Sequence, residues 1–261
     1  MDANTKKALF SFFDTANRFF SDTGSPPAVP PEFTGGALPA NSVPDTRTDT
    51  EAGRIRKPDG HFTGLQDIAG AVLSCQACGL SAGRKHAVPG EGVADAFVMV
   101  IGEGPGAEED LQGRPFVGRS GQLLDKMLAA VSLSRTVNVF IANIVKCRPP
   151  GNRDPQPEES EACAGYLAAQ IAYIKPKAIL ALGRIASRNL LATNEGITRL
   201  RGRFFDYRGI PLMPTYHPSA LLRDENLKRP AWEDLKRFRE KLRELEPGYE
   251  AAFAARRETG V

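Results

Sequence analysis

Three nearly continuous apolar runs, alternating with helical patterns, constrain the fold of this chain most strongly. The runs are residues 96–101 (AFVMVI), 137–144 (VNVFIANI) and 178–182 (AILAL). Runs of this length are typical of strands that are buried on both faces of a sheet. The helical patterns cover residues 123–131, 157–174 and 184–191. Because strands that alternate with helices form right-handed crossovers, the sequence predicts an α/β fold of three layers, α/β/α, around a central and mainly parallel sheet.

The local composition divides the 261 residues into four parts. Leu9 and five phenylalanines predict an amphipathic helix within residues 1–23. Seven prolines and five glycines in residues 24–60 predict a flexible linker over residues 24–62, because such a segment buries too little apolar surface to offset its ordering entropy. The α/β domain then spans residues 63–246, and residues 247–261 form a C-terminal tail.

The overall composition points to a globular protein in water. Hydrophobic residues make up 41% of the chain and charged residues 25%, which are ordinary values for such proteins. No segment approaches the roughly 20 apolar residues that span a bilayer, and the first 20 residues lack the apolar core of a secretory signal. We therefore expect no membrane contact and a cytoplasmic location. The net charge of +3 is compatible with a nucleic-acid partner without requiring one.

The four cysteines form two pairs with different spacing. Cys75 and Cys78 make a C-x-x-C pair, whereas fifteen residues separate Cys147 from Cys163. Four thiolates with none left over fit a tetrahedral zinc ion or one iron–sulfur cluster, and they favour a reducing compartment over a disulfide framework. The wide second pair departs from the zinc-ribbon pattern of two short pairs. Four buried thiols without a metal are the alternative.

Three polar segments follow the predicted strands and mark a candidate site. They are residues 102–106 (GEGPG) after the first run, Asn143 at the end of the second, and residues 217–219 (HPS) after a further strand predicted at residues 212–216. Ligands of open parallel sheets bind at the carboxyl ends of the strands, so we expect these distant segments to converge. His217 is a candidate catalytic or ligand-orienting residue, and Ser219 is a candidate cap of the helical turn that follows. Asn143 needs either backbone partners or a ligand, because a buried amide requires hydrogen bonds.

The first of these segments also matches the dinucleotide fingerprint G-x-G-x-x-G/A. We reject a nucleotide site because Pro105 has no backbone donor, and because Glu103 and its acidic neighbours would surround a pyrophosphate with like charge. A glycine-rich loop edged by carboxylates instead suits a neutral or cation-like ligand. Arginines and lysines near the same edge favour phosphate contacts.

Four motifs occur in one order along the chain. They are residues 103–106 (EGPG) with 109–110 (ED), residues 113–118 (GRPFVG), residues 143–150 (NIVKCRPP) and residues 217–223 (HPSALLR). Together they resemble the motifs of family 4 uracil-DNA glycosylases, over residues 74–245 or roughly two thirds of the chain. The four cysteines stand where that family holds a 4Fe–4S cluster. The resemblance implies a uracil-DNA glycosylase-like fold and an enzyme that flips uracil out of DNA, hydrolyses its N-glycosidic bond and leaves an abasic site.

The resemblance also implies roles for individual residues. His217 would donate to O2 of the base, and Glu103 would orient the attacking water, with Glu109 as a second candidate for that carboxylate. Phe116 would stack on the base, and the amide of Asn143 would pair with the imide N–H and carbonyl of uracil. The residues expected to bind uracil are Gly104, Pro105, Phe116, Asn143 and His217. Those expected to contact DNA are Arg114, Arg119, Lys146, Arg148, Arg201, Ser219 and Arg223.

The partners and the place of action follow from the same resemblance. Cys75, Cys78, Cys147 and Cys163 would hold the cluster, which would be structural and take no redox step. Uracil-containing DNA would be the partner of a monomer that acts in the cytoplasm, at the nucleoid. A related protein class binds uracil-DNA irreversibly through a histidine in an inserted loop. Residues 149–156 contain no histidine and no insertion, so turnover is favoured over a DNA-binding or damage-sensing role without turnover.

Overall fold

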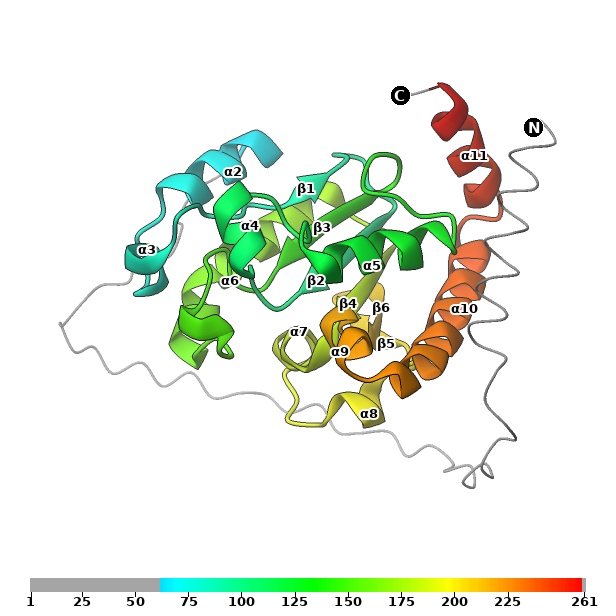
Figure 1. The fold of residues 1–261 in the computed structure, drawn as a ribbon. Coiled ribbons are helices and arrows are strands. Elements are labelled where there is room, and N and C mark those ends of the chain that lie inside the picture. Colours follow the sequence, from blue (N-terminus) through cyan, green and yellow to red (C-terminus); the bar gives the residue numbers. More distant parts are fainter. Residues whose placement is uncertain (1–61, 260–261) are drawn as a thin grey trace. The chain divides into compact units, whose positions relative to one another are not determined.

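The computed structural model describes residues 62–259, with side chains through Arg256, and these residues contain a six-stranded sheet (Figure 1). The strands are β1 (Glu91–Gly92), β2 (Val98–Gly102), β3 (Val139–Asn143), β4 (Ala178–Leu182), β5 (Phe205–Tyr207) and β6 (Ile210–Thr215). Their order in the sheet is β1-β3-β2-β4-β6-β5. The four central strands run parallel, and the short edge strands β1 and β5 are antiparallel to their neighbours. The predicted fold class is confirmed.

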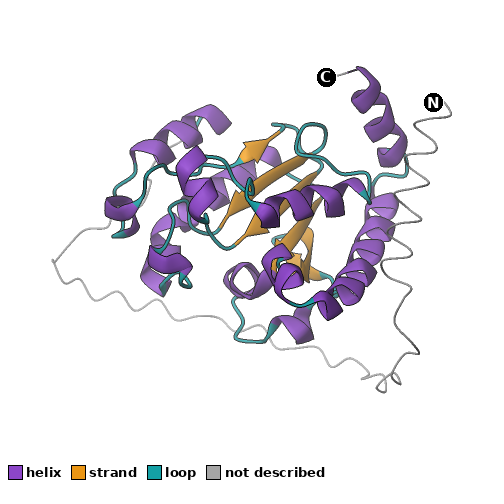
Figure 2. Cartoon of the chain, in the orientation of Figure 1, coloured by secondary structure: helices purple, strands orange, loops and turns teal. Residues whose placement is uncertain are grey.

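Helices cover both faces of this sheet (Figure 2). One face packs against α2 (Leu65–Ser74), α6 (Pro157–Ile174) and α7 (Gly183–Leu191). The other face packs against α5 (Arg119–Ala129), α9 (Pro218–Arg223) and α10 (Lys228–Leu245). The shorter elements, together with the final helix, are α3 (Leu80–Gly83), α4 (Ala107–Gln112), η1 (Pro150–Asn152), α8 (Ile197–Leu200), η2 (Glu225–Leu227) and α11 (Tyr249–Thr259).

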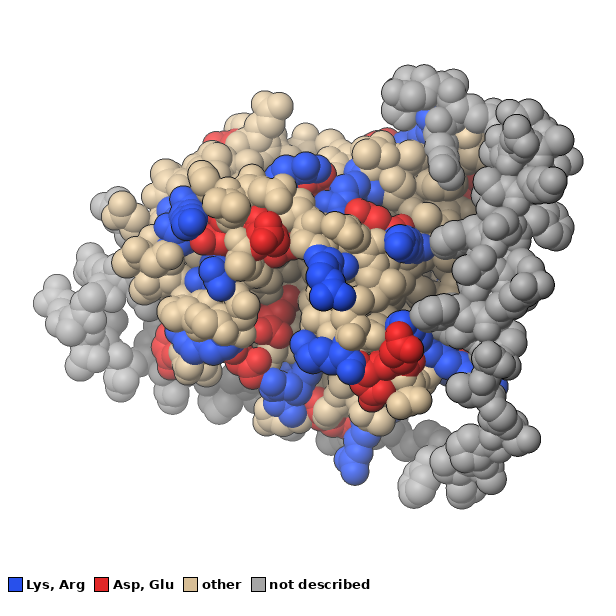
Figure 3. All heavy atoms as spheres, viewed as in Figure 1, with Lys and Arg blue, Asp and Glu red and all other residues tan. Residues whose placement is uncertain are grey.

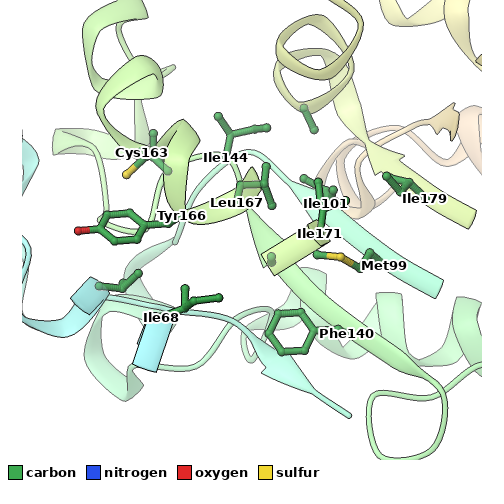
Figure 4. Packing of buried hydrophobic residues seen from close by; sticks show 14 of the residues in the cluster. Ile68, Met99, Ile101, Phe140, Ile144, Cys163, Tyr166, Leu167, Ile171 and Ile179 are labelled. Carbon is green, nitrogen blue, oxygen red and sulfur yellow. The ribbon is translucent and has the colours of Figure 1, made fainter. Parts of the chain in front are cut away.

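The central strands are apolar throughout because both of their faces are buried. In β2, Val98 and Val100 join the cluster beneath α5, whereas Met99 and Ile101 join the cluster beneath α6. Figure 4 shows the second cluster, in which Met99 and Ile101 belong with Ile171 of α6. This two-sided burial explains why the strands read as unbroken apolar runs in the sequence.

The two ends of the chain stand differently against the predictions. The segment predicted as a C-terminal tail contains α11, and the hydroxyl of its buried Tyr249 donates to the carbonyl of Val131 at 3.0 Å. The helix predicted within residues 1–23 and the linker predicted at 24–62 lie outside the described residues, apart from Phe62, which packs on the core.

Within the part of the chain that the structure describes, no helix combines the length and apolarity that crossing a membrane requires.

Candidate active site

The carboxyl ends of β2, β3, β4 and β6 border one cavity of about 510 Å³. Small-molecule sites commonly enclose about 300–1,000 Å³. The cavity brings together every residue for which the sequence predicted a catalytic or base-contacting role. These residues are Glu103, Gly104, Pro105, Phe116, Asn143 and His217. The predicted convergence of distant segments at one edge of the sheet therefore exists in the fold.

Asn143 ends β3 with an amide oxygen that lacks a hydrogen-bond partner. The residue is 2% exposed, and Oδ1 is buried with no partner among the described residues. A β-carbon at Gly102 would lie 2.5 Å from this oxygen, so a glycine is required beside it. An unsatisfied buried acceptor costs on the order of 1–3 kcal/mol. The cavity thus presents an acceptor that a ligand N–H group would satisfy.

Phe116 presents its ring to the cavity from a backbone conformation that side chains seldom adopt. Its φ is +53° and its exposure is 6%. The guanidinium of Arg135 donates to the carbonyls of Pro115 and Phe116 at 2.8 and 2.9 Å. The ring centroid of Phe116 lies 5.6 Å from that of His217. Outliers of this kind cost about 1–3 kcal/mol and persist where the surroundings hold them, so Arg135 is part of what fixes the aromatic wall.

Gly121→Ala is expected to displace this wall. A β-carbon at Gly121 would lie 1.9 Å from the carbonyl oxygen of Phe116, which is backbone and cannot rotate away. We expect the free energy of unfolding to fall by roughly 1–3 kcal/mol, as overpacking does, measured by urea denaturation. Gly70→Ala is the matched control, because a β-carbon there meets nothing within 4 Å, and it should raise stability slightly. Equal midpoints for the two variants would contradict the prediction.

His217 caps α9 with its own ring. Its Nδ1 accepts the backbone N–H of Ser219 at 3.1 Å, and Ser219 Oγ lies 2.8 Å from the same nitrogen. The prediction that Ser219 is the cap is wrong, because the capping side chain is that of His217. Burial lowers the pKa of His217 to about 4, and Arg223 adds to this shift while Glu109 opposes it. A neutral ring whose Nδ1 accepts carries its proton on Nε2.

The two candidate carboxylates have different surroundings. Glu109 is occupied by the backbone, since its oxygens accept the N–H groups of Gly106, Val117 and Gly118 at 3.1, 2.9 and 3.0 Å. Burial raises the pKa of Glu103 to about 7. Glu109 therefore braces the loops, whereas the carboxyl of Glu103 can exchange a proton near neutral pH.

An ion pair that the sequence did not predict adjoins Glu103. Asp154, which follows η1, accepts from Arg184 of α7 at 2.6 Å, and both residues line the cavity. Asp154 further raises the pKa of Glu103, whereas Arg184 lowers it. Tyr216 and Ser120 also line the cavity without having been predicted. Tyr216 directly precedes the 217–223 motif and Ser120 lies two residues after the 113–118 motif, whereas Asp154 and Arg184 lie outside the four motifs.

The four cysteines line a second, smaller cavity, next to α2 and α3. Arg84 Nη1 donates to Cys147 Sγ at 3.0 Å, and the N–H of Ala77 donates to Cys75 Sγ at 3.4 Å. Burial raises the pKa of the Cys163 thiol to about 11. Within residues 62–259, no three His, Cys, Asp or Glu side chains converge tightly enough to hold a single metal ion. The four thiols stand around one shared space.

The predicted DNA contacts fall into two groups. Lys146 is corrected: it is 1% exposed, and its ammonium is held in the interior. Arg201 is held by Asp234 at 2.7 Å and is one fifth exposed, which gives it a structural position. The others stand at the cavity or on the surface. Ser219 and Arg223 line the cavity, Arg119 is exposed, Arg114 is exposed and paired with Glu91, and half-buried Arg148 donates to Asn152.

The cavity belongs to a face that carries many basic groups. Figure 3 shows Lys and Arg side chains spread over the face with α4, α5 and α9, with acidic groups between them. Such a surface suits contacts with phosphates on either side of the cavity.

Comparison with known proteins gives consistent matches. The family model described as the uracil DNA glycosylase superfamily matches residues 89–236. A type-4 uracil-DNA glycosylase of Saccharolobus solfataricus is 44% identical over 187 residues, which are 68% of this chain and 86% of that protein. The type-4 enzyme of Sulfurisphaera tokodaii is 43% identical over 67% of this chain and 84% of its own length. That of Thermotoga maritima is 44% identical over 66% and 92%.

Proposed function

The chain belongs to the uracil-DNA glycosylase superfamily, together with the type-4 enzymes, and we propose that it excises uracil from DNA in base-excision repair. The reaction adds water across the N-glycosidic bond between C1′ of deoxyribose and N1 of uracil. It releases free uracil and leaves an abasic site. The observation that carries the proposal is the unpartnered Oδ1 of Asn143 inside a cavity of suitable size.

We propose that Asn143 selects uracil by its hydrogen-bonding edge. Oδ1 would accept the N3–H of uracil, and Nδ2 would donate to the adjacent O4. Cytosine presents an acceptor at N3 and a donor at N4, so both contacts would become repulsive. Phe116 would stack on the base, and the backbone of Gly104 and Pro105 would border its edge. The flipped base would therefore satisfy an amide oxygen that has no partner among the described residues.

The chemistry is assigned to two side chains. As the glycosidic bond breaks, negative charge develops on uracil O2 and positive charge on the sugar. The Nε2–H of neutral His217 would donate to O2, and the carboxylate of Glu103 would orient the attacking water and counter the charge on the sugar. Because Nδ1 of His217 is fixed on α9, the donor is positioned before substrate arrives.

DNA contacts are proposed for the rim of the cavity. Ser219 and Arg223 of α9 and the half-buried Arg148 would contact phosphates next to the flipped nucleotide. Exposed Arg114 and Arg119 would extend this contact along the backbone. The enzyme would act as a monomer. Its place of action would be the cytoplasm, at the nucleoid.

The test is incubation with a uracil-containing oligonucleotide, followed by alkali to break abasic sites. Strand breakage at the uracil, with none in a thymine or cytosine control, is the expected result. Free uracil should appear in equal amount and in excess over protein, because the enzyme turns over. A protein that binds uracil-DNA tightly without releasing base would instead favour the damage-sensing alternative.

We propose that the smaller cavity holds a 4Fe–4S cluster on Cys75, Cys78, Cys147 and Cys163. Four thiols that line one cavity, and that are all the cysteines of the chain, support a four-cysteine centre. The cluster would supply structure, because it ties the loop after β3 to α2 and α6. These residues would hold it: two cysteines between α2 and α3, one after β3 and one in α6.

The purified protein is expected to be brown and to contain about four irons per chain. Cys147→Ser should lose iron and visible absorption and unfold at lower temperature, since a buried ligand is removed. Absorbance spectra and iron analysis check this. A colourless protein with one zinc per chain would contradict the cluster without affecting the proposed reaction.

A further inference from the structure

Among the described residues, Lys146 is a buried cation that has no carboxylate partner. It is among the largest fully buried side chains of the described residues. Its Nζ donates to the carbonyl of Asn143 at 3.0 Å and to Oε1 of Gln170 at 2.8 Å. Burial lowers the pKa of this ammonium, and among the described residues the Cys163 thiol is the acidic group whose charge raises it. A buried ammonium is costly unless an opposite charge compensates it.

The cysteine cavity beside Lys146 is the proposed source of that opposite charge. Lys146 lines the cysteine cavity together with Cys147 and Cys163. Four thiolates around a zinc ion or an iron–sulfur core give a centre of net negative charge. The ammonium would then face an anion on one side and the end of β3 on the other. A methionine would fill nearly the same space without any charge to compensate.

The same ammonium also contacts the end of β3 that carries the proposed uracil-reading amide. The carbonyl that Nζ holds belongs to Asn143, whose amide oxygen lacks a partner in the cavity. Fixing this carbonyl fixes the peptide from which the amide projects. Gln170, the second acceptor, is itself anchored because its Nε2 donates to the carbonyl of Pro89 at 2.7 Å. The ammonium therefore has a rigid support on α6.

We propose that Lys146 is a positioning residue that couples the metal centre to uracil recognition by Asn143. The centre compensates the ammonium, and the ammonium holds the strand end that presents the amide. This inference rests on the proposed function, because Asn143 must read uracil for its position to matter. Lys146 itself contacts neither DNA nor uracil.

Lys146→Met tests the coupling with two measurements on the metal-loaded protein. The first is the rate at which metal passes to a chelator, which should increase. The second is the inhibition constant of free uracil in the excision assay, which should rise by roughly 10-fold or more, as expected when a charged hydrogen bond is lost. A variant that was merely less folded would bind uracil normally in its folded fraction, so its inhibition constant would not change.

Two variants serve as controls. Lys177→Met removes one exposed lysine near the start of β4 and should leave both measurements at wild-type values. Asn143→Ala should raise the inhibition constant while metal release stays at the wild-type rate. Lys146→Met is thus expected to change both the inhibition constant of uracil and the rate of metal release, whereas neither control should change both.

The outcomes separate the two levels of inference. A wild-type protein that releases no uracil would overturn the proposed function. A wild-type enzyme that works, with Lys146→Met at the normal inhibition constant or the normal rate of metal release, would overturn the coupling alone. If Lys146→Met does not fold, Gln170→Leu takes its place, because it removes one of the two acceptors. It should then show smaller changes of the same sign in both measurements, and wild-type values in either would overturn the coupling.

Discussion

Replacing His217 with leucine is expected to lower kcat for uracil release by roughly 10²–10³-fold, because one preorganised donor to a developing oxyanion is worth that much. Leucine keeps apolar packing against Phe116 but offers no N–H group. Binding of uracil-containing DNA should change little, since most of that affinity comes from phosphate contacts. Single-turnover excision and DNA titration measure the two effects separately.

His217→Asn is the matched variant, because it separates catalysis from helix capping. The leucine variant also removes the cap that Nδ1 provides at α9, at a cost of about 1 kcal/mol. Asparagine is a favoured cap and should restore stability. Its side chain is shorter than histidine and should not reach uracil O2, so excision should remain low. Recovery of activity together with stability would show that His217 acts through the helix rather than on the base.

The neutral state of His217 gives this prediction a second check. Burial lowers the pKa of His217 to about 4, so its ring is uncharged near pH 7. The hydrogen bond from its Nε2–H group should strengthen as uracil O2 gains negative charge. The titration of His217 should therefore cause no change in the excision rate above about pH 5. A limb that disappears in His217→Asn would contradict the assignment of a neutral donor.

The sequence predicted the central sheet and the location of the site well, for a physical reason. Buried parallel strands must be apolar along their whole length, and polar residues can follow only where the strands end. Asn143 is the clearest instance, because it ends an apolar run and stands at the edge of the cavity. The short edge strand β1 has two residues and no such pattern, so it was not predicted.

The predictions that Lys146 and Arg201 contact DNA were based on their charge, but burial and ion pairing decide the roles of these two side chains. Lys146 lies between a predicted strand and a basic loop, and only the packing of α6 reveals that its ammonium points inward to Gln170. Arg201 is likewise held by Asp234, which is 33 positions later in the chain. The pair of Asp154 and Arg184 was not predicted because its members come from different segments. Long-range pairing of this kind leaves no local signal.

Excision by the wild-type enzyme is expected to rise with pH through an apparent pKa near 7. Burial raises the pKa of Glu103 to that value, and only the ionised carboxylate can orient water and counter the charge on the sugar. The protonated form dominates below this pKa, so activity should fall at acid pH and level off at alkaline pH. Glu103→Gln should lose roughly 10²–10⁴-fold in kcat and show no such limb.

Neighbouring charges should move this limb in opposite directions. Asp154→Asn removes a like charge and frees Arg184 from its ion pair, and both changes lower the pKa of Glu103. The limb should then shift to lower pH. Arg184→Met removes the opposing cation, so the limb should shift to higher pH. Profiles of kcat against pH should give the lowest apparent pKa for Asp154→Asn, an intermediate one for the wild type and the highest for Arg184→Met.

His217 does not account for such a limb, because burial lowers its pKa to about 4. Glu109 accepts three backbone N–H groups, and Arg153 is paired with Glu159 at 2.6 Å. A limb that persists in Glu103→Gln, or that fails to move in either neighbour variant, would mean that another group activates the water. Opposite shifts would assign the titration to Glu103, because among the cavity residues its carboxyl is the one whose pKa Asp154 raises and Arg184 lowers.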